Sequence, residues 1–385
     1  MELIVDEKFV IENLQRMVNI NSTNPTLGEN NVGEAEIAEY IAQTLDDLGL
    51  EVTIQEVAPG RPNVIGILKG SGDGRSLMFN GHTDTVGVEG MSEPFSGAIR
   101  DGKLYGRGAQ DMKASLAAMI GSAKAILDAG ITLSGDLVLA FVVDEEVMSI
   151  GTDGLVPQFI TDAAIVTEPT DMTLSRAHRG FIWYEVQTSG RAAHGSRYNE
   201  GIDANMRMGR FLAHLDKLEQ ELLDREPHAL AGPPSLHAST IQGGTEISVY
   251  AANCLLQVER RTIPGETIAS STPDFQAIID RLAAEDGTFQ ATVQATFKRE
   301  PFEVDQDAAI VKTIEQATTN RLGSNPQHTG QTFWTDAAIL AHAGIETALI
   351  GPIGAGLHSA EEWVDVRSVI DLTYILAETA VIFCT

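Results

Sequence analysis

Five short segments of this 385-residue chain carry acidic or histidine side chains beside glycines or at the ends of apolar runs. The residues concerned are His82 and Asp84, Asp111, Asp144-Glu145-Glu146, Glu168 and His358. Most of these segments follow β-like runs, and open α/β sheets bind ligands outside the carboxyl ends of their strands. Carboxylates and imidazoles gathered at such an edge need a cation to hold them together. The pattern therefore predicts one dinuclear metal site.

The acidic run 144–146 is the sharpest of these signals. It ends the apolar run 137–143, and three adjacent carboxylates repel one another unless a cation neutralises them or one stays protonated. Neighbouring side chains point in different directions, so one glutamate can bind metal while the next faces the substrate as a base. The alternative is that this run is an exposed acidic loop. For Asp144 alone, that interpretation remains possible.

The other candidates each have an ordinary structural alternative. His82 and Asp84 are two residues apart, so extended backbone would place them on one face, where Asp84 could orient the imidazole. Asp111 could be only a helix N-cap, or its carboxylate could bridge two cations. Glu168 could simply begin a loop. His358 lies in a glycine-rich loop that would let its imidazole approach a site closely.

Two imidazoles and three carboxylates suit two zinc ions that share one bridging carboxylate and one water. The proposed ligands are His82, Asp111, Glu146, Glu168 and His358. This set leaves Glu145 outside the ligands. A cation that prefers only oxygen, such as calcium, would not need two imidazoles, whereas cobalt or manganese could replace zinc.

Alternating strands and helices must position these residues. Strands are expected at 51–57, 64–68, 77–80, 137–143 and 163–167, and helices on both sides of the turn-rich segment 21–31, after Asp111, after Gly151, and near 307–320, 335–343 and 367–383. This order predicts an α/β fold with a largely parallel twisted sheet and helices on both faces.

The pattern changes between residues 178 and 297, which predicts an inserted α+β sandwich. Strands are expected there at 181–187, 237–242, 246–250, 255–260 and 289–298, and helices at 203–225 and 273–284. The first pattern resumes afterwards. We therefore expect a discontinuous catalytic domain at 1–177 and 298–385, interrupted by the insertion 178–297.

Composition excludes several classes of protein. The net charge of −28 argues against binding to nucleic acid or to anionic membranes. No apolar stretch is as long as a membrane span, and the acidic N-terminal residues do not resemble a signal peptide. Cys254 and Cys384 are far apart in the sequence, which indicates reduced thiols in a cytoplasmic protein.

In order and type, the motifs resemble those of the dinuclear-zinc family of acetylornithine deacetylase, succinyl-diaminopimelate desuccinylase, aminoacylases and glutamate carboxypeptidases. The resemblance covers nearly the whole chain. It implies one zinc ion on His82 and Glu168, a second on Glu146 and His358, and a bridge through Asp111.

The same resemblance implies roles beyond the ligands. Glu145 would be the general base, Asp84 would orient His82, and a cis peptide bond would follow Asp111. The insertion resembles the family's dimerisation domain, from which His194 would reach the partner subunit's site and stabilise the oxyanion. We therefore expect a homodimer.

Two arginines, and two differences from the family's usual sequence, bear on how the substrate would be bound. Arg179 and Arg261 match positions that engage the substrate carboxylate. Where the family usually has Asn and Pro after a double glycine, this chain has Ser248 and Ala251, and Glu259 replaces an aspartate. These departures concern substrate and oxyanion contacts and leave the metal ligands intact.

The expected function is hydrolysis of the amide bond of an N-acyl amino acid by zinc-activated water, with Glu145 as general base. An exopeptidase acting on short peptides is the alternative, because its scissile bond is chemically the same. A non-catalytic metal-binding protein is a third hypothesis. Glu145 beside Glu146 argues against it, since a structural site has no use for the extra acid.

Overall fold

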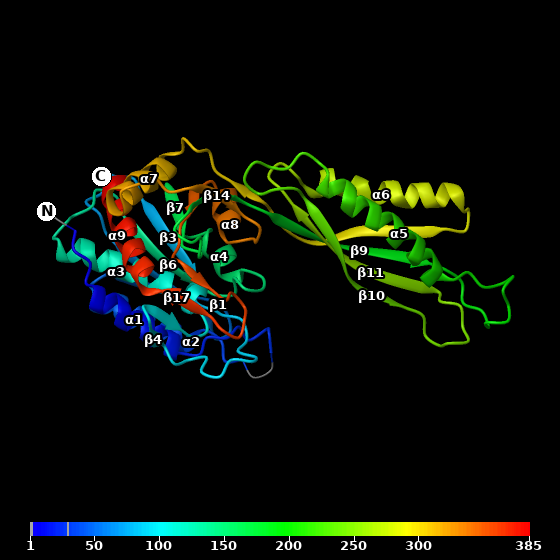
Figure 1. The fold of residues 1–385 in the computed structure, drawn as a ribbon, viewed down its shortest axis with the longest axis horizontal. Helices are drawn as coiled ribbons and strands as arrows, with labels where there is room; N and C mark the ends of the chain where they lie inside the picture. The colour runs from blue at the N-terminus through cyan, green and yellow to red at the C-terminus, as the bar shows by residue number, and fades with distance from the viewer. Residues whose placement is uncertain (1–2, 29–30) are drawn as a thin grey trace. The chain divides into compact units, whose positions relative to one another are not determined.

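In the computed structural model, which describes residues 3–28 and 31–385, the chain forms two compact units (Figure 1). Unit 1 extends to Arg176 and continues in Val304–Thr329 and Thr335–Thr385. Unit 2 comprises Ala177–Glu303 and Gly330–Trp334, so it is inserted into unit 1.

A nine-stranded mixed sheet contains the central strands of unit 1, with strand order β1-β2-β6-β3-β7-β15-β8-β13 and with β14 paired to β8; its last strand, β13, falls within the residues of unit 2. The strands are β1 (Glu51–Ala58), β2 (Arg61–Leu68), β3 (Leu77–His82), β6 (Leu137–Val142), β7 (Ala163–Val166), β8 (Leu174–His178), β13 (Phe302–Glu303), β14 (His328–Gln331) and β15 (Glu346–Leu349). The central strands β6, β3, β7 and β15 are parallel, and the flanking pairs are antiparallel.

The central strands consist of apolar runs because both of their faces are buried. The helices of unit 1 are α1 (Glu7–Asn19), α2 (Ala35–Asp47), α3 (Ala114–Asp128), α4 (Ile150–Leu155), α7 (Ala309–Leu322), α8 (Ala337–His342) and α9 (Val366–Phe383). On β3, Gly81 faces Leu116 of α3, whereas its neighbour Asn80 donates to Thr152 of α4. Adjacent strand residues point to opposite faces, so α3 and α4 cover opposite sides of the sheet. The predicted fold class is confirmed.

Five short elements of unit 1 were not predicted from the sequence. They are β4 (Ala98–Arg100), β5 (Lys103–Tyr105), the irregular π-type turn η1 (Ala109–Lys113), β16 (Gly354–Ala355) and β17 (Trp363–Asp365). The β-strands among them form a second sheet, ordered β16-β17-β5-β4. That sheet joins a segment near residue 105 to one near residue 363.

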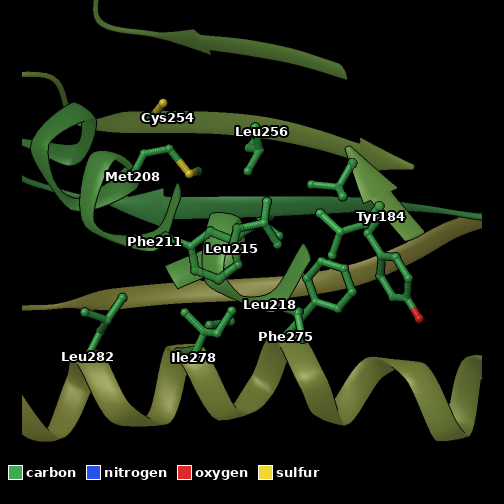
Figure 2. Close-up of a cluster of buried hydrophobic side chains, with 14 of the residues drawn as sticks. Tyr184, Met208, Phe211, Leu215, Leu218, Cys254, Leu256, Phe275, Ile278 and Leu282 are labelled. Carbon is green, nitrogen blue, oxygen red and sulfur yellow. The ribbon is translucent and has the colours of Figure 1, made fainter. Parts of the chain in front are cut away.

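Unit 2 is an antiparallel sheet, ordered β10-β11-β9-β12, with two helices packed on it. Its elements are β9 (Gly180–Ser189), α5 (Ala204–Leu223), β10 (Ser235–Gly243), β11 (Asn253–Thr262), α6 (Ile268–Glu285) and β12 (Gln290–Arg299). Burial alternates along β9 and β11, and Figure 2 shows their inward side chains meeting Phe211 and Leu215 of α5 and Phe275 of α6.

The strand expected at 246–250 is wrong. Gly244 adopts a left-handed φ of +81° directly after β10, where the chain leaves the sheet. The segment then forms a turn whose only ladder contact among the described residues is a single bridge from Val249 to His194.

Within the described part of the chain, no helix is long and apolar enough to span a membrane. Cys254 and Cys384 are both buried and form no disulfide.

Candidate metal centre

The carboxyl ends of the parallel strands bring the predicted metal ligands together. His82 is the last residue of β3, the acidic run 144–146 follows β6, and Glu168 follows β7. His358 lies in the loop between β16 and β17 and is half exposed, whereas His82 is 1% exposed.

Asp111 lies between the two imidazoles. Its Oδ1 is 3.1 Å from Nε2 of His82, and its Oδ2 is 3.3 Å from Nε2 of His358. Oε1 of Glu168 lies 3.7 Å from Nε2 of His82, and Oε2 of Glu146 lies 3.0 Å from Nε2 of His358. One carboxylate therefore faces two separate His–Glu pairs, an arrangement suited to bridging two cations.

The donor set fits divalent cations. The donor atoms of His82, Glu145 and Glu168 lie within 4.8 Å of one another, as do those of His82, Asp111 and Glu146. Burial raises the pKa of Glu168 to about 8, and the Asp111 and Glu146 carboxylates act in the same direction. Burial followed by the charge of Glu168 raises the pKa of Glu145 well above its usual range. Cations with nitrogen and oxygen ligands would relieve this crowding of negative charge.

The backbone around Asp111 is irregular. Asp111 and Met112 have non-helical φ/ψ values inside η1, and the peptide bond between them is cis, as the resemblance implied. Gly108, directly before η1, adopts a φ of +78°, where a Cβ atom would also lie 2.8 Å from Thr85.

Glu362, to which the sequence analysis gave no role, holds this turn. Its Oε1 accepts hydrogen bonds from the backbone N–H groups of Gln110 (2.9 Å) and Asp111 (3.1 Å). Its Oε2 accepts from Arg107 (2.6 Å) and from the N–H of Gly108 (3.1 Å). Arg107 in turn donates to the carbonyl of Ser359, beside His358. A buried ion pair thus ties the Asp111 turn to the His358 loop.

Asp84 connects His82 to the acidic run. Nδ1 of His82 is 2.9 Å from the backbone oxygen of Asp84 and 3.5 Å from its carboxylate. The Asp84 carboxylate accepts from the backbone N–H groups of Glu145 (3.1 Å) and Glu146 (3.3 Å). Burial alone would raise the pKa of Asp84, but the contact with His82 and further hydrogen bonds hold it below its usual value.

The remaining predicted residues belong to unit 2. His194 is exposed, and its Nδ1 lies 2.9 Å from the hydroxyl of Ser196. Arg179 donates to the carbonyl of Ala231, and Arg261 forms an ion pair with Glu259 at 2.6 Å. Burial lowers the pKa of Arg179, and the charge of Arg261 acts in the same direction.

Known proteins match the chain over most of its length. The sequence model of "Peptidase family M20/M25/M40" matches residues 78–381. N-formyl-4-amino-5-aminomethyl-2-methylpyrimidine deformylase of Bacillus subtilis (strain 168) is 29% identical over 91% of this chain and 89% of its own. Acetylornithine deacetylase of Myxococcus xanthus is 29% identical over 88% of this chain and 86% of its own.

Solved structures share the fold. The YXEP protein of Bacillus subtilis, described as a dinuclear metal binding peptidase from the M20 family, superposes with a TM-score of 0.75 and 18% identity, covering 98% of each chain. At this identity the likeness establishes the fold alone. The family match carries the conclusion: this chain belongs to peptidase family M20/M25/M40 and is a metal-binding hydrolase of amide bonds.

Proposed function

We propose that the chain is a zinc-dependent N-deacylase that releases a small acyl group from an amino acid or a closely related amine. The observation that carries the proposal is the placement of Asp111 between two imidazoles, with Glu145 beside the donor atoms of His82 and Glu168. This arrangement supplies a complete ligand set and one further carboxylate to move a proton.

Each residue of the cluster would have a defined task. The proposed ligands of two zinc ions, with cobalt or manganese as possible substitutes, are His82, Asp111, Glu146, Glu168 and His358. When bound, the ions would polarise the scissile carbonyl and lower the pKa of water. Glu145 would take a proton from the attacking water onto its carboxylate and return it to the departing amine nitrogen.

One observation favours a deacylase over an exopeptidase. The two curated relatives described above are named as a deformylase and a deacetylase, and each aligns with most of this chain. The guanidinium groups of Arg179 and Arg261 would bind the substrate carboxylate, a group that N-acyl amino acids and short peptides both carry.

We further propose that unit 2 joins two copies of the chain. β10 is the edge strand of its sheet and is mostly exposed, and Met206 on α5 and Ile241 on β10 are exposed apolar residues. An unpaired edge strand beside apolar side chains is a favourable surface for two-fold pairing. His194 would then stabilise the oxyanion in the partner's site, a contribution of about 2.7–4 kcal/mol for such a donor.

The proposed location is the cytoplasm, which the two buried, unpaired thiols support. The proposed substrate is a small molecule, since the charge of −28 disfavours nucleic acids and anionic membranes as partners.

The test is hydrolysis by zinc-loaded protein of a matched panel of N-formyl amino acids, N-acetyl amino acids and dipeptides. We expect kcat/KM to be highest for the formyl or acetyl substrates. Hydrolysis confined to the dipeptides would replace the deacylase assignment with the exopeptidase alternative. Full metal loading without hydrolysis of any amide would refute the catalytic proposal.

A further inference from the structure

A buried ion pair lies behind the metal centre and had no role in the sequence analysis. Arg61 begins β2 and Glu34 precedes α2, and their side chains are 9% and 0% exposed. The guanidinium binds both carboxylate oxygens of Glu34, and its NH1 donates to Oδ1 of Asp144 at 2.7 Å. One cation therefore contacts two buried carboxylates.

Asn24 extends this network to Asp84. Its Nδ2 donates to Oδ2 of Asp84 at 2.8 Å and to Oδ1 of Asp144 at 3.0 Å. The oxygen and nitrogen of the Asn24 side-chain amide cannot exchange places without losing hydrogen bonds, because the oxygen accepts from both the backbone N–H and the hydroxyl of Thr26. The two carboxylates thus lie within about 6 Å of each other, a separation at which like charges repel strongly in a buried site.

The network ends on the proposed catalytic groups. The carboxylate of Asp84 accepts hydrogen bonds from the backbone N–H groups of Glu145 and Glu146, and the backbone oxygen of Asp84 is hydrogen-bonded to the imidazole of His82. Asp144 has a left-handed φ of 71°, and its carbonyl accepts from the N–H of Ser149 at 2.6 Å, so it shapes the loop that carries both glutamates. A shift of Asp144 or Asp84 would displace ligands of both proposed ions.

We propose that Arg61 is a positioning residue: its charge offsets the repulsion between Asp144 and Asp84 and so holds Glu145, Glu146 and His82 in place. The inference rests on the proposed function. Without the charge of Arg61, the carboxylates of Asp144 and Asp84 move apart, and the acidic run 144–146 shifts. Loss of a partner behind the ligands typically weakens metal binding or activity by about 10–100-fold.

The experiment compares wild type, Arg61→Met and Arg61→Lys by titration of chelator-treated protein with Co²⁺, followed by visible absorption and by hydrolysis. We expect Co²⁺ affinity to fall by about 10–100-fold in Arg61→Met. At saturating Co²⁺ its absorption bands should shift, and kcat should fall while KM stays close to that of wild type. Arg61→Lys should be intermediate, because lysine keeps the charge but cannot bind two carboxylates as a planar fork.

Arg321→Met is the matched control. Arg321 forms a two-contact ion pair with Asp371, at 2.6 and 2.7 Å, in the same compact unit. This variant should lose stability while keeping the wild-type Co²⁺ affinity and spectrum. The control separates a general loss of stability from a specific effect on the ligands.

An Arg61→Met protein with the Co²⁺ affinity and spectrum of wild type would overturn the inference, even if it melted at a lower temperature. If Arg61→Met does not fold, an unchanged affinity in Arg61→Lys has the same meaning. Wild type that binds Co²⁺ but hydrolyses no amide contradicts only the proposed function, because the affinities still test Arg61. Wild type that binds no Co²⁺ contradicts both.

Discussion

The carboxylate of Glu362 provides a sharp test of how the Asp111 turn is held. It accepts hydrogen bonds from three backbone N–H groups and from Arg107, two donors on each oxygen. Glu362→Gln keeps the shape of the side chain but replaces one acceptor oxygen with an NH₂ donor. Two of the four donors then lose their acceptor, and Arg107, only 2% exposed, loses the compensating charge.

The expected loss in the free energy of unfolding is large because Arg107 and Glu362 form a buried ion pair. Removing one partner of a buried ion pair costs about 3–5 kcal/mol, since the remaining charge stays without compensation. Urea unfolding of metal-free protein, followed by circular dichroism, measures the change in the free energy of unfolding. We also expect weaker metal binding, by about 10–100-fold, because Glu362 accepts a hydrogen bond from the backbone N–H of Asp111, the proposed bridging ligand.

The neighbouring residue supplies the control. Glu361 is exposed, and Glu361→Gln removes the same charge from the same loop. It should therefore change the free energy of unfolding by no more than about 0.5 kcal/mol. Unfolding free energies of the two variants that differ by less than about 1 kcal/mol would contradict a stabilising role of the buried Glu362 carboxylate, because it would then be equivalent to an exposed one.

Three further predictions concern the base, the dimer and the ligands. Glu145→Gln should keep its metal content while kcat falls by about 10²–10⁴, and a fully active variant would exclude Glu145 as the base. Mixing inactive His194→Ala and Glu145→Gln proteins should restore part of the activity after subunit exchange; demonstrated exchange without recovery would remove His194 from the partner's site. Because the pKa of Glu168 is raised to about 8 and that of His358 to about 10, metal binding should release protons and tighten as the pH rises through this range. Calorimetry in buffers of different ionisation enthalpy measures the protons released, and a pH-independent affinity would contradict the assignment.

The parallel core and the meeting of the proposed ligands in space could be predicted because their signals are local. Apolar runs buried on both faces become central parallel strands, and the carboxyl ends of those strands meet at one edge. His82 and Glu168 each lie at or just beyond such a run, so their positions along the chain indicated their meeting in space.

The residues that hold the ligands gave no such signal. Arg61 contacts Asp144 across 83 positions, and Glu362 contacts Asp111 across 251. Such pairs have no characteristic spacing, and a lone arginine or glutamate in a sequence is usually a solvated surface residue. The short strands near 100, 355 and 364 were missed because two or three residues cannot display an alternating pattern.

The most direct test of the central claim is the metal content of Asp111→Ala compared with wild type, measured by elemental analysis after zinc loading and removal of unbound metal. Because Asp111 faces both imidazoles, we predict two zinc ions per chain in wild type, together with loss of both ions and of hydrolysis in the variant. Two ions per chain in a folded Asp111→Ala protein would contradict the bridged dinuclear site.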